Sequence, residues 1–142
     1  MNAQQLFSYA NLFALAGWLA LLLAPVRRSL MVAAARWVSA VLAGGYVSLL
    51  LFSLARGGGG PAPDFSSLAS LAALFGRPEV LLVGWLHYLA FDLWVGSWMA
   101  GDAERARVSH ALVVPCLALT FLAGPCGLLL YLLIRAGRRR RA

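Results

Sequence analysis

The sequence contains no lysine and few acidic residues, and its positive charge comes from arginine alone. Charged side chains make up only 12% of the 142 residues, whereas a soluble domain usually reaches about 25%. Hydrophobic residues make up 62%, and the mean hydropathy is +0.81. A single small domain has too little interior to bury this apolar excess. The composition therefore excludes an ordinary soluble domain and predicts an integral membrane protein.

Cysteine and histidine are also scarce, with two of each. Cys116 and Cys126 lie in one apolar segment, about 15 Å apart on a helix, which is too far for a disulfide within it. The candidate metal ligands fall at different depths and form no HExxH or ExxH motif: His87, Asp92, Asp102 and His110. We therefore predict no metal site, no haem and no other cofactor.

The net charge of +7 lies partly in a basic tail, residues 135–142. Such a tail can bind nucleic acid, but beside a membrane helix it more often contacts anionic lipid headgroups. We predict membrane lipids as partners and no nucleic acid, and the oligomeric state is open. The stretch MNAQQLFSYANLF has no basic region before the first apolar run, so we expect a retained span rather than a cleaved signal peptide.

Apolar segments long enough to cross a bilayer, which takes about 20 residues, recur along the chain. The predicted fold is all-α, one membrane domain over residues 1–142 with four transmembrane helices. A shorter amphipathic segment, with Asp64 as its expected N-cap, predicts an interfacial helix at residues 65–75 between spans two and three. The expected spans are residues 6–24, 32–55, 79–100 and 109–134, and the glycine run 57–60 closes the second.

The fourth expected span contains Pro115 and Pro125, which predict a kink or a broken helix there. Four spans would place both termini on one side of the membrane. The arginines then divide almost evenly between the two sides, so the positive-inside rule favours cytoplasmic termini only weakly.

Two ionisable residues, His87 and Asp92, interrupt the apolar run GWLHYLAFDLW in the third span. A carboxylate buried in hydrocarbon is costly unless paired or neutral, so such a residue often marks a functional site. A structural hydrogen bond between helices is the alternative for each residue. The two lie about 140° apart around the helix, so they form no same-face pair, although a pocket could bring them together.

Aromatic residues surround these two groups. They can form a membrane-interface belt, or an aromatic cleft that suits a long, flat, apolar ligand. Counting residues outward from the 101–108 loop along the third and fourth spans places Thr120 at the depth of His87. The same count places Asp102 close enough to meet His110. The candidate catalytic pair is His87 and Asp92, with Asp102 and His110 as polar support and a substrate-binding set of Trp85, Tyr88, Phe91, Trp94, Gly96, Trp98 and Thr120.

Four motifs are specific enough to compare with known proteins: DFSSLASLAALF (64–75), GWLHYLAFDLWVGSW (84–98), the 102–110 loop ending in SH, and VVPCLALTFLAGPCGLL (113–129). Together they resemble the family of the plant abscisic-acid-deficient-four protein, a membrane protein of neoxanthin synthesis, and its bacterial relatives of unknown function. The resemblance extends loosely over the first span and is most specific at Trp85, His87, Asp92, Leu93, His110, Pro125 and Gly127.

The resemblance implies a multi-pass membrane protein of carotenoid metabolism. The plant relatives are required to convert violaxanthin to neoxanthin, which opens an epoxide and removes a proton to form an allene. Such an isomerase needs an acid at the epoxide oxygen and a base at the carbon-bound proton. We hypothesise that Asp92 and His87 fill these roles, in either order. The ends show no Ser-rich transit segment and the chain is rich in Ala, Gly and Arg, so we expect a bacterial member in the inner (plasma) membrane.

Two further functions fit the same residues. The protein can bind a carotenoid or lipid, or assist another enzyme, without catalysis of its own. His87 and Asp92 would then tie helices together, and their loss would lower thermal stability rather than change a product. A proton or ion path is less favoured, because no polar stripe in the other spans matches Asp92.

Overall fold

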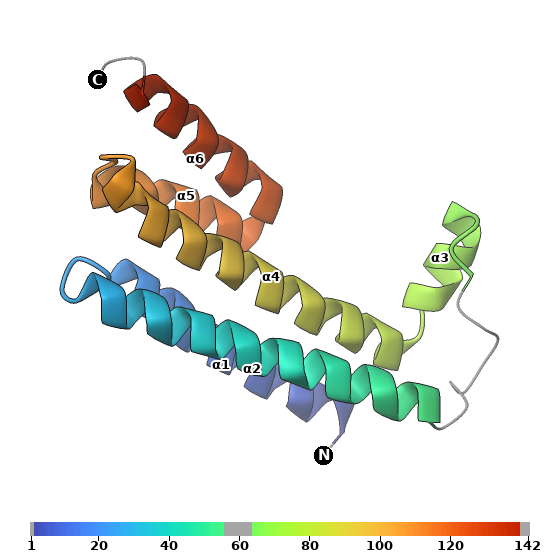
Figure 1. Cartoon of the computed structure of the whole chain (residues 1–142). Coiled ribbons are helices and arrows are strands. Elements are labelled where there is room, and N and C mark those ends of the chain that lie inside the picture. Colours follow the sequence, from blue (N-terminus) through green and yellow to red (C-terminus); the bar gives the residue numbers. More distant parts are fainter. Residues whose placement is uncertain (1, 56–63, 140–142) are drawn as a thin grey trace.

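Three long helices, α1, α2 and α4, form the body of the structure (Figure 1). The structure, a computed structural model, describes residues 2–55 and 64–139. α1 spans Ala3–Leu22, α2 Arg28–Ala55 and α4 Pro78–Arg105, and each is long and apolar enough to cross a membrane. The prediction of an all-helical membrane protein is thereby supported, with three such helices. The glycine run expected to close the second span lies outside the described residues, as do Arg140 and Arg141 of the expected basic tail.

Local sequence explains where the long helices begin. Asn2 caps α1 through a capping box, in which its side chain accepts from the backbone N–H of Gln5 at 2.8 Å and the Gln5 side chain accepts from the Asn2 N–H at 3.0 Å. α4 starts with Pro78 in its first turn, followed by Glu79. Proline lacks an N–H that would be unpaired there, and the carboxylate favours the positive end of the helix dipole.

The short helix α3, Leu68–Phe75, is the expected amphipathic segment, but it begins later than predicted. Its N-cap is Ser67, whose hydroxyl accepts from the N–H of Ser70 at 3.1 Å. Asp64 lies before it and accepts from the N–H of Ser66 at 2.8 Å. Hydrogen bonds from the side chain of Ser66, and to a smaller extent from its backbone, lower the pKa of the Asp64 carboxyl. The interpretation of Asp64 as the N-cap was therefore wrong, because its side chain closes a local turn instead.

The segment 109–134 is two helices rather than one continuous span. α5, His110–Leu122, continues through Pro115, and α6 starts again at Gly124 and runs to Arg139. Between them Ala123 is extended, with φ −155° and ψ 80°. The predicted break is therefore found at Pro125 but not at Pro115. The count of four spans is not confirmed, because α5 and α6 would be about 20 and 24 Å long, short of a hydrocarbon core of about 30 Å.

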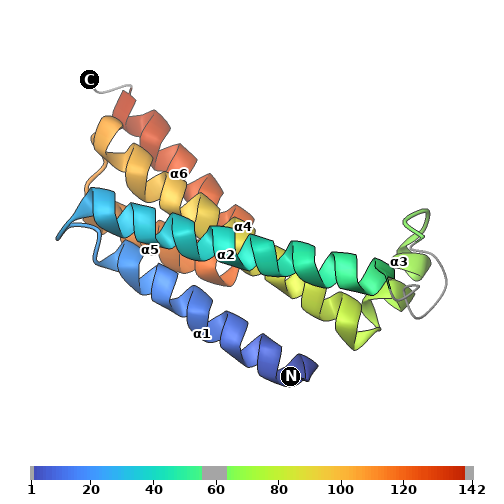
Figure 2. The same cartoon turned by 60° about the horizontal axis from the view of Figure 1, so that its bottom comes forward.

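Glycine makes it possible for α6 to fold back on α5. A side chain at Gly127 would collide with the hydroxyl of Thr120 and the carbonyl oxygen of Cys116 on α5. A side chain at Gly124, at the turn, would likewise collide with the carboxyl group of Asp92 on α4. Small residues allow such close backbone approach between membrane helices. The two helices thus form a hairpin, which we call the α5–α6 hairpin, against one half of α4 (Figure 2).

The hairpin determines where the chain ends relative to the bundle. α6 returns to the end of the bundle where α4 ends, because Arg135 pairs with Asp102 there, whereas the start of α1 lies at the other end (Figures 1 and 2). Seven arginines whose side chains the structure describes gather at this end, and we call it the arginine-rich end: Arg27, Arg28, Arg36, Arg105, Arg107, Arg135 and Arg138. Arg77 lies at the opposite end, just before α4. The arginines are therefore not divided evenly, as the expected four spans implied.

Close contacts between small and large residues hold α1 and α2 on α4. A side chain at Gly17 would lie 2.5 Å from the buried Leu93, and one at Gly96 would lie 2.8 Å from the ring of Trp18. On the α2 side, the buried hydroxyl of Ser39 donates to the carbonyl of Ala90 at 2.7 Å. These contacts fix the register in which α4 presents its polar residues.

Candidate functional site

Asp92 lies near the middle of α4, directly beneath the tip of the α5–α6 hairpin. It is about 15 Å along the helix from Asp102, which marks the arginine-rich end. The side chain is half-buried, its Oδ1 abuts Gly124, and its Oδ2 is buried without a hydrogen-bond partner in the described part of the chain. Buried polar atoms are almost always paired, so an unpaired carboxyl oxygen at this depth requires an explanation.

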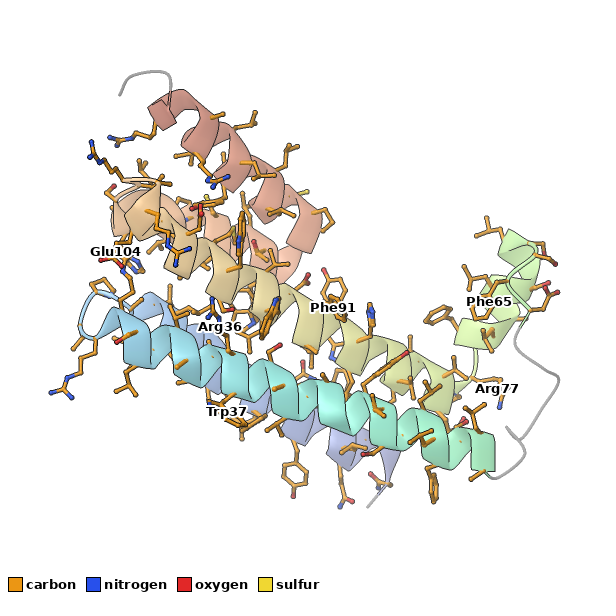
Figure 3. All side chains as sticks on the ribbon, in the orientation of Figure 1. Arg36, Trp37, Phe65, Arg77, Phe91 and Glu104 are labelled. Carbon is orange, nitrogen blue, oxygen red and sulfur yellow. The ribbon has the colours of Figure 1, made fainter. Side chains whose placement is uncertain are left out.

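His87 does not meet Asp92. Its imidazole is exposed and stacks on Phe91, with ring centroids 4.5 Å apart, and it lies 5.6 Å from the ring of Tyr46 on α2. It therefore faces away from the hairpin tip. Between the two ionisable groups, Tyr88 and Phe91 expose their rings on the surface of α4, and Phe91 projects from α4 near the start of α6 (Figure 3). The two groups flank one aromatic strip, which we define as Tyr88 and Phe91.

Trp85 extends this aromatic surface toward α1. Its indole N–H donates to Asn11 Oδ1 at 3.2 Å, and its ring stacks on Tyr88 at 5.7 Å and contacts Phe7 at 5.6 Å. The indole therefore has a structural partner on α1, while its stacked face continues the strip. Asn11 and Phe7 were not among the predicted residues, since nothing in the sequence of α1 pairs them with the third span.

Two residues of the predicted substrate-binding set, Gly96 and Thr120, are buried where helices pack. Gly96 is buried and receives Trp18 of α1. Thr120 is buried, donates to the carbonyl of Cys116 at 2.8 Å on its own helix, and lies where α6 crosses at Gly127. The expected bond between Thr120 and His87 is therefore not formed, since the counting that paired them assumed a single straight fourth span.

Asp102 and His110 also have separate partners. Asp102 forms an ion pair with Arg135 Nε at 2.7 Å and accepts a hydrogen bond from the hydroxyl of Tyr131 at 2.7 Å. His110 Nε2 lies 3.1 Å from the carbonyl oxygen of Leu22 at the end of α1. Asp102 and His110 therefore do not meet as expected: Asp102 ties α6 to α4, and His110 ties α5 to the end of α1. Tyr131 and Arg135 were missed because the prediction assigned them to the far end of a straight helix.

Trp94 and Trp98 line a pocket between α2 and α4 at the arginine-rich end. Trp94 is half exposed with the guanidinium of Arg36 5.7 Å from its ring centroid, and Trp98 packs edge-on against Tyr131 at 5.6 Å. Arg36 projects into the space between the two helices (Figure 3). The pocket has a volume of about 590 Å³ and is lined by Arg28, Ser29, Val32, Ala33, Arg36, Trp37, Ala40, Trp94, Trp98, Gly101, Asp102, Glu104 and Arg105.

The described residues contain no group of three or more His, Cys, Asp or Glu side chains close enough to hold a metal ion together. Cys116 is buried and Cys126 exposed, and they form no disulfide. Asp92 and His87 are titratable side chains in the middle of α4, and arginines line the pocket between α2 and α4.

Comparison with known protein families matches residues 5–131 to the family described as ABA DEFICIENT 4-like. The match covers the three long helices, α5 and the first half of α6, and so includes every predicted site residue. No curated protein and no solved structure matches the chain.

Proposed function

The chain belongs to the ABA DEFICIENT 4-like family, and we propose that it is a membrane isomerase acting on an epoxide-bearing carotenoid or a related isoprenoid lipid. In this proposal the apolar substrate lies over the aromatic strip of Tyr88 and Phe91. Asp92 then touches one edge of the substrate and His87 the other. The unpaired, buried Oδ2 of Asp92 is the observation that carries the proposal.

The proposed reaction needs two groups at two places on the substrate. One group donates a proton to the epoxide oxygen while its carbon–oxygen bond breaks, which leaves a hydroxyl group. The other removes a proton from a neighbouring carbon, and the electron pair of that bond forms the new double bond. The acid ends deprotonated and the base protonated, so one proton returned between them completes an isomerisation without any other reactant. Asp92 and His87 lie about 7.5 Å apart along the helix axis, on opposite sides of the strip.

The environment of Asp92 suits a proton-transfer group better than a structural one. Its Oδ2 is buried and unpaired among the described residues, so no hydrogen bond from those residues holds a proton there. The adjoining hairpin tip shields the group from water, and a site from which water is excluded strengthens each electrostatic contact with the substrate. The exposed rings of Tyr88 and Phe91 provide an apolar platform beside it.

The first test identifies the bound molecule. Protein purified in mild detergent from its own host is extracted, and bound pigments and lipids are identified by mass spectrometry. We expect a carotenoid or isoprenoid that is enriched over ordinary phospholipid. The identified compound, and violaxanthin as a defined epoxide, are then supplied in liposomes and the products are analysed.

The matched variants separate catalysis from folding. Asp92→Asn keeps the shape of the side chain but cannot donate or accept the proton in the same way, and we expect turnover to fall by at least about 100-fold. His87→Gln is expected to give a comparable loss. Asp64→Asn, an equivalent change at an exposed turn, should leave turnover intact. Unchanged turnover in both Asp92→Asn and His87→Gln would sink the proposal.

A second function, lipid or carotenoid binding without catalysis, is favoured by the contact between Asp92 and Gly124. In that case the carboxyl group positions the hairpin tip and has no chemical role. Asp92→Asn would then lower the melting temperature and leave the same bound compound unchanged in structure. Normal stability together with lost turnover supports the isomerase, so the two measurements decide between the functions.

A further inference from the structure

We propose that the pocket between α2 and α4 binds one anionic membrane phospholipid, with its phosphate on Arg36 and Arg105 and an acyl chain along Trp37 and Trp94. This site is separate from the aromatic strip and does not depend on the proposed isomerase function. Three features support it: arginines at one end of the pocket, an apolar wall at the other end, and the distance that the lining extends along α2.

The part of the pocket nearest the arginine-rich end has more positive than negative side chains. Arg28 is held by a hydrogen bond from its Nη1 to the carbonyl of Ala100 at 3.1 Å, and no carboxylate of the described residues pairs with it, with Arg36 or with Arg105. The carboxylate of Asp102 is already paired with Arg135. Glu104 is then the one remaining acidic side chain in the lining, so the arginines outnumber the acids.

Arg36 is the residue that extends this charge into the membrane. It lies eight positions after the first residue of α2, or about 12 Å along the helix. Its side chain stacks over Trp94, and its Nη2 would lie 3.5 Å from a side chain at Gly101. The guanidinium thus points back toward the arginine-rich end, where it can reach a phosphate, as long cationic side chains do near membrane interfaces.

The part of the pocket farther from the arginine-rich end is apolar. Trp37 is 72% exposed and Trp94 50% exposed, and Ala40 continues the wall on α2. From Arg28 to Ala40 the lining extends about 18 Å along the helix, close to half the thickness of a bilayer. Its volume of about 590 Å³ falls in the usual range of small-molecule sites, about 300–1,000 Å³.

This polarity gradient selects an anionic amphiphile. A neutral carotenoid would fill the apolar part but leave the arginines unpaired. A free phosphate would satisfy the arginines but leave the tryptophans uncovered. A guanidinium binds phosphate through two parallel hydrogen bonds, and membranes supply phosphate on lipids that already lie at this depth. A single phospholipid with net negative charge therefore fits both parts of the pocket.

Native mass spectrometry of the detergent-purified full chain tests the site with two defined lipids, dioleoyl phosphatidylglycerol and dioleoyl phosphatidylcholine. We expect one phosphatidylglycerol to bind more tightly than phosphatidylcholine. Arg36→Gln and Arg105→Gln should each weaken it about fivefold, the effect of one arginine near an anionic lipid surface. Arg138→Gln is the matched control, because it removes the same charge at the same end on an exposed residue outside the lining.

Each outcome decides the proposal. Equal affinity for the two lipids, or equal weakening by Arg138→Gln, would show a general surface-charge effect and overturn it. Full competition by millimolar inorganic phosphate would show a headgroup site without a chain and overturn the lipid assignment, as would stronger binding of an isoprenyl phosphate. Arg36 and Arg105 are both exposed, so Arg105→Gln decides the result if Arg36→Gln does not fold. Asp92→Asn should bind the lipid normally, whether or not the isomerase proposal holds.

Discussion

Asp102 near the end of α4 holds Arg135 of α6, with Nε 2.7 Å from Oδ2 and Nη2 3.1 Å from Oδ1. The Nη2 contact is a hydrogen bond, and the shorter Nε contact acts as an ion pair. Both side chains are largely buried, and Tyr131 adds a third bond to the same carboxylate. This relationship brings the end of α6 back to the arginine-rich end and so determines the course of the last quarter of the chain.

Breaking this pair should destabilise the hairpin. Asp102→Asn removes the charge but keeps the shape, and we expect a loss of about 3 kcal/mol in the free energy of unfolding, because it leaves Arg135 without its carboxylate. Thermal unfolding in detergent measures the loss. Glu104→Gln, an exposed acid two residues later, should change little. The double variant Asp102→Asn with Arg135→Gln should cost less than the two single losses combined, and simple additivity would contradict the pairing.

The crossing of α5 and α6 should tolerate no side chain at Gly127. Gly127→Ala places a methyl group on the hydroxyl of Thr120 and the backbone of Cys116, and backbone cannot move aside as a flexible side chain can. We expect a destabilisation of at least about 1–3 kcal/mol, the usual cost of overpacking. Gly137→Ala on the same helix is the control, since a side chain there meets nothing within 4 Å. Equal melting temperatures for the two variants would refute the close crossing of α5 and α6.

The hairpin also predicts the membrane sides of exposed residues. We expect Ser109→Cys and Gly137→Cys to lie on one side and Gln4→Cys on the other, with the arginine-rich end in the cytoplasm by the positive-inside rule. A membrane-impermeant maleimide applied to intact and permeabilised cells reports each position. The wild-type chain, with Cys116 and Cys126, gives the background labelling. A fourth complete span would instead give Gln4→Cys and Gly137→Cys the same accessibility.

The hydrogen bond between α2 and α4 should contribute modestly. Ser39→Ala removes the donor to Ala90 in a buried position, and we expect a loss of about 0.6–1.7 kcal/mol, as for other hydrogen bonds between membrane helices. Ser48→Ala on the same helix is the matched control, because its exposed hydroxyl donates to Gly44 one turn earlier within α2. Thermal unfolding measures both. A larger effect of Ser48→Ala than of Ser39→Ala would argue against this packing of α2 on α4.

Much of the helical framework could be predicted from local patterns. The first three expected spans correspond to α1, α2 and α4, because length and hydropathy are properties of each segment alone. The break near Pro125 could also be predicted, since proline acts on the backbone of its own segment. The start of α3 was misassigned because Asp64 and Ser67 both suit an N-cap, and only their hydrogen bonds distinguish them.

The candidate site was only partly predictable. Helical periodicity correctly separated His87 from Asp92, and the exposed aromatic strip between them follows from the same spacing. Periodicity could not assign Thr120 and Gly96 to packing, because that role depends on which residue of another helix lies opposite. It likewise gave no indication that Arg36 and Trp94, on different helices, would line one pocket.

The sequence by itself determined that this is a membrane protein of helices, which family it belongs to, and which ionisable groups lie within its third long helix. Those conclusions rest on composition and on motifs within single segments. The tertiary structure decided that the last apolar segment turns back at Gly124, so that Asp92 meets its tip and the arginines gather at one end. That outcome depends on a glycine of α6 fitting against the backbone of α5 and on Arg135 reaching Asp102. Contacts of this kind join residues whose distances along the chain carry no periodic signal.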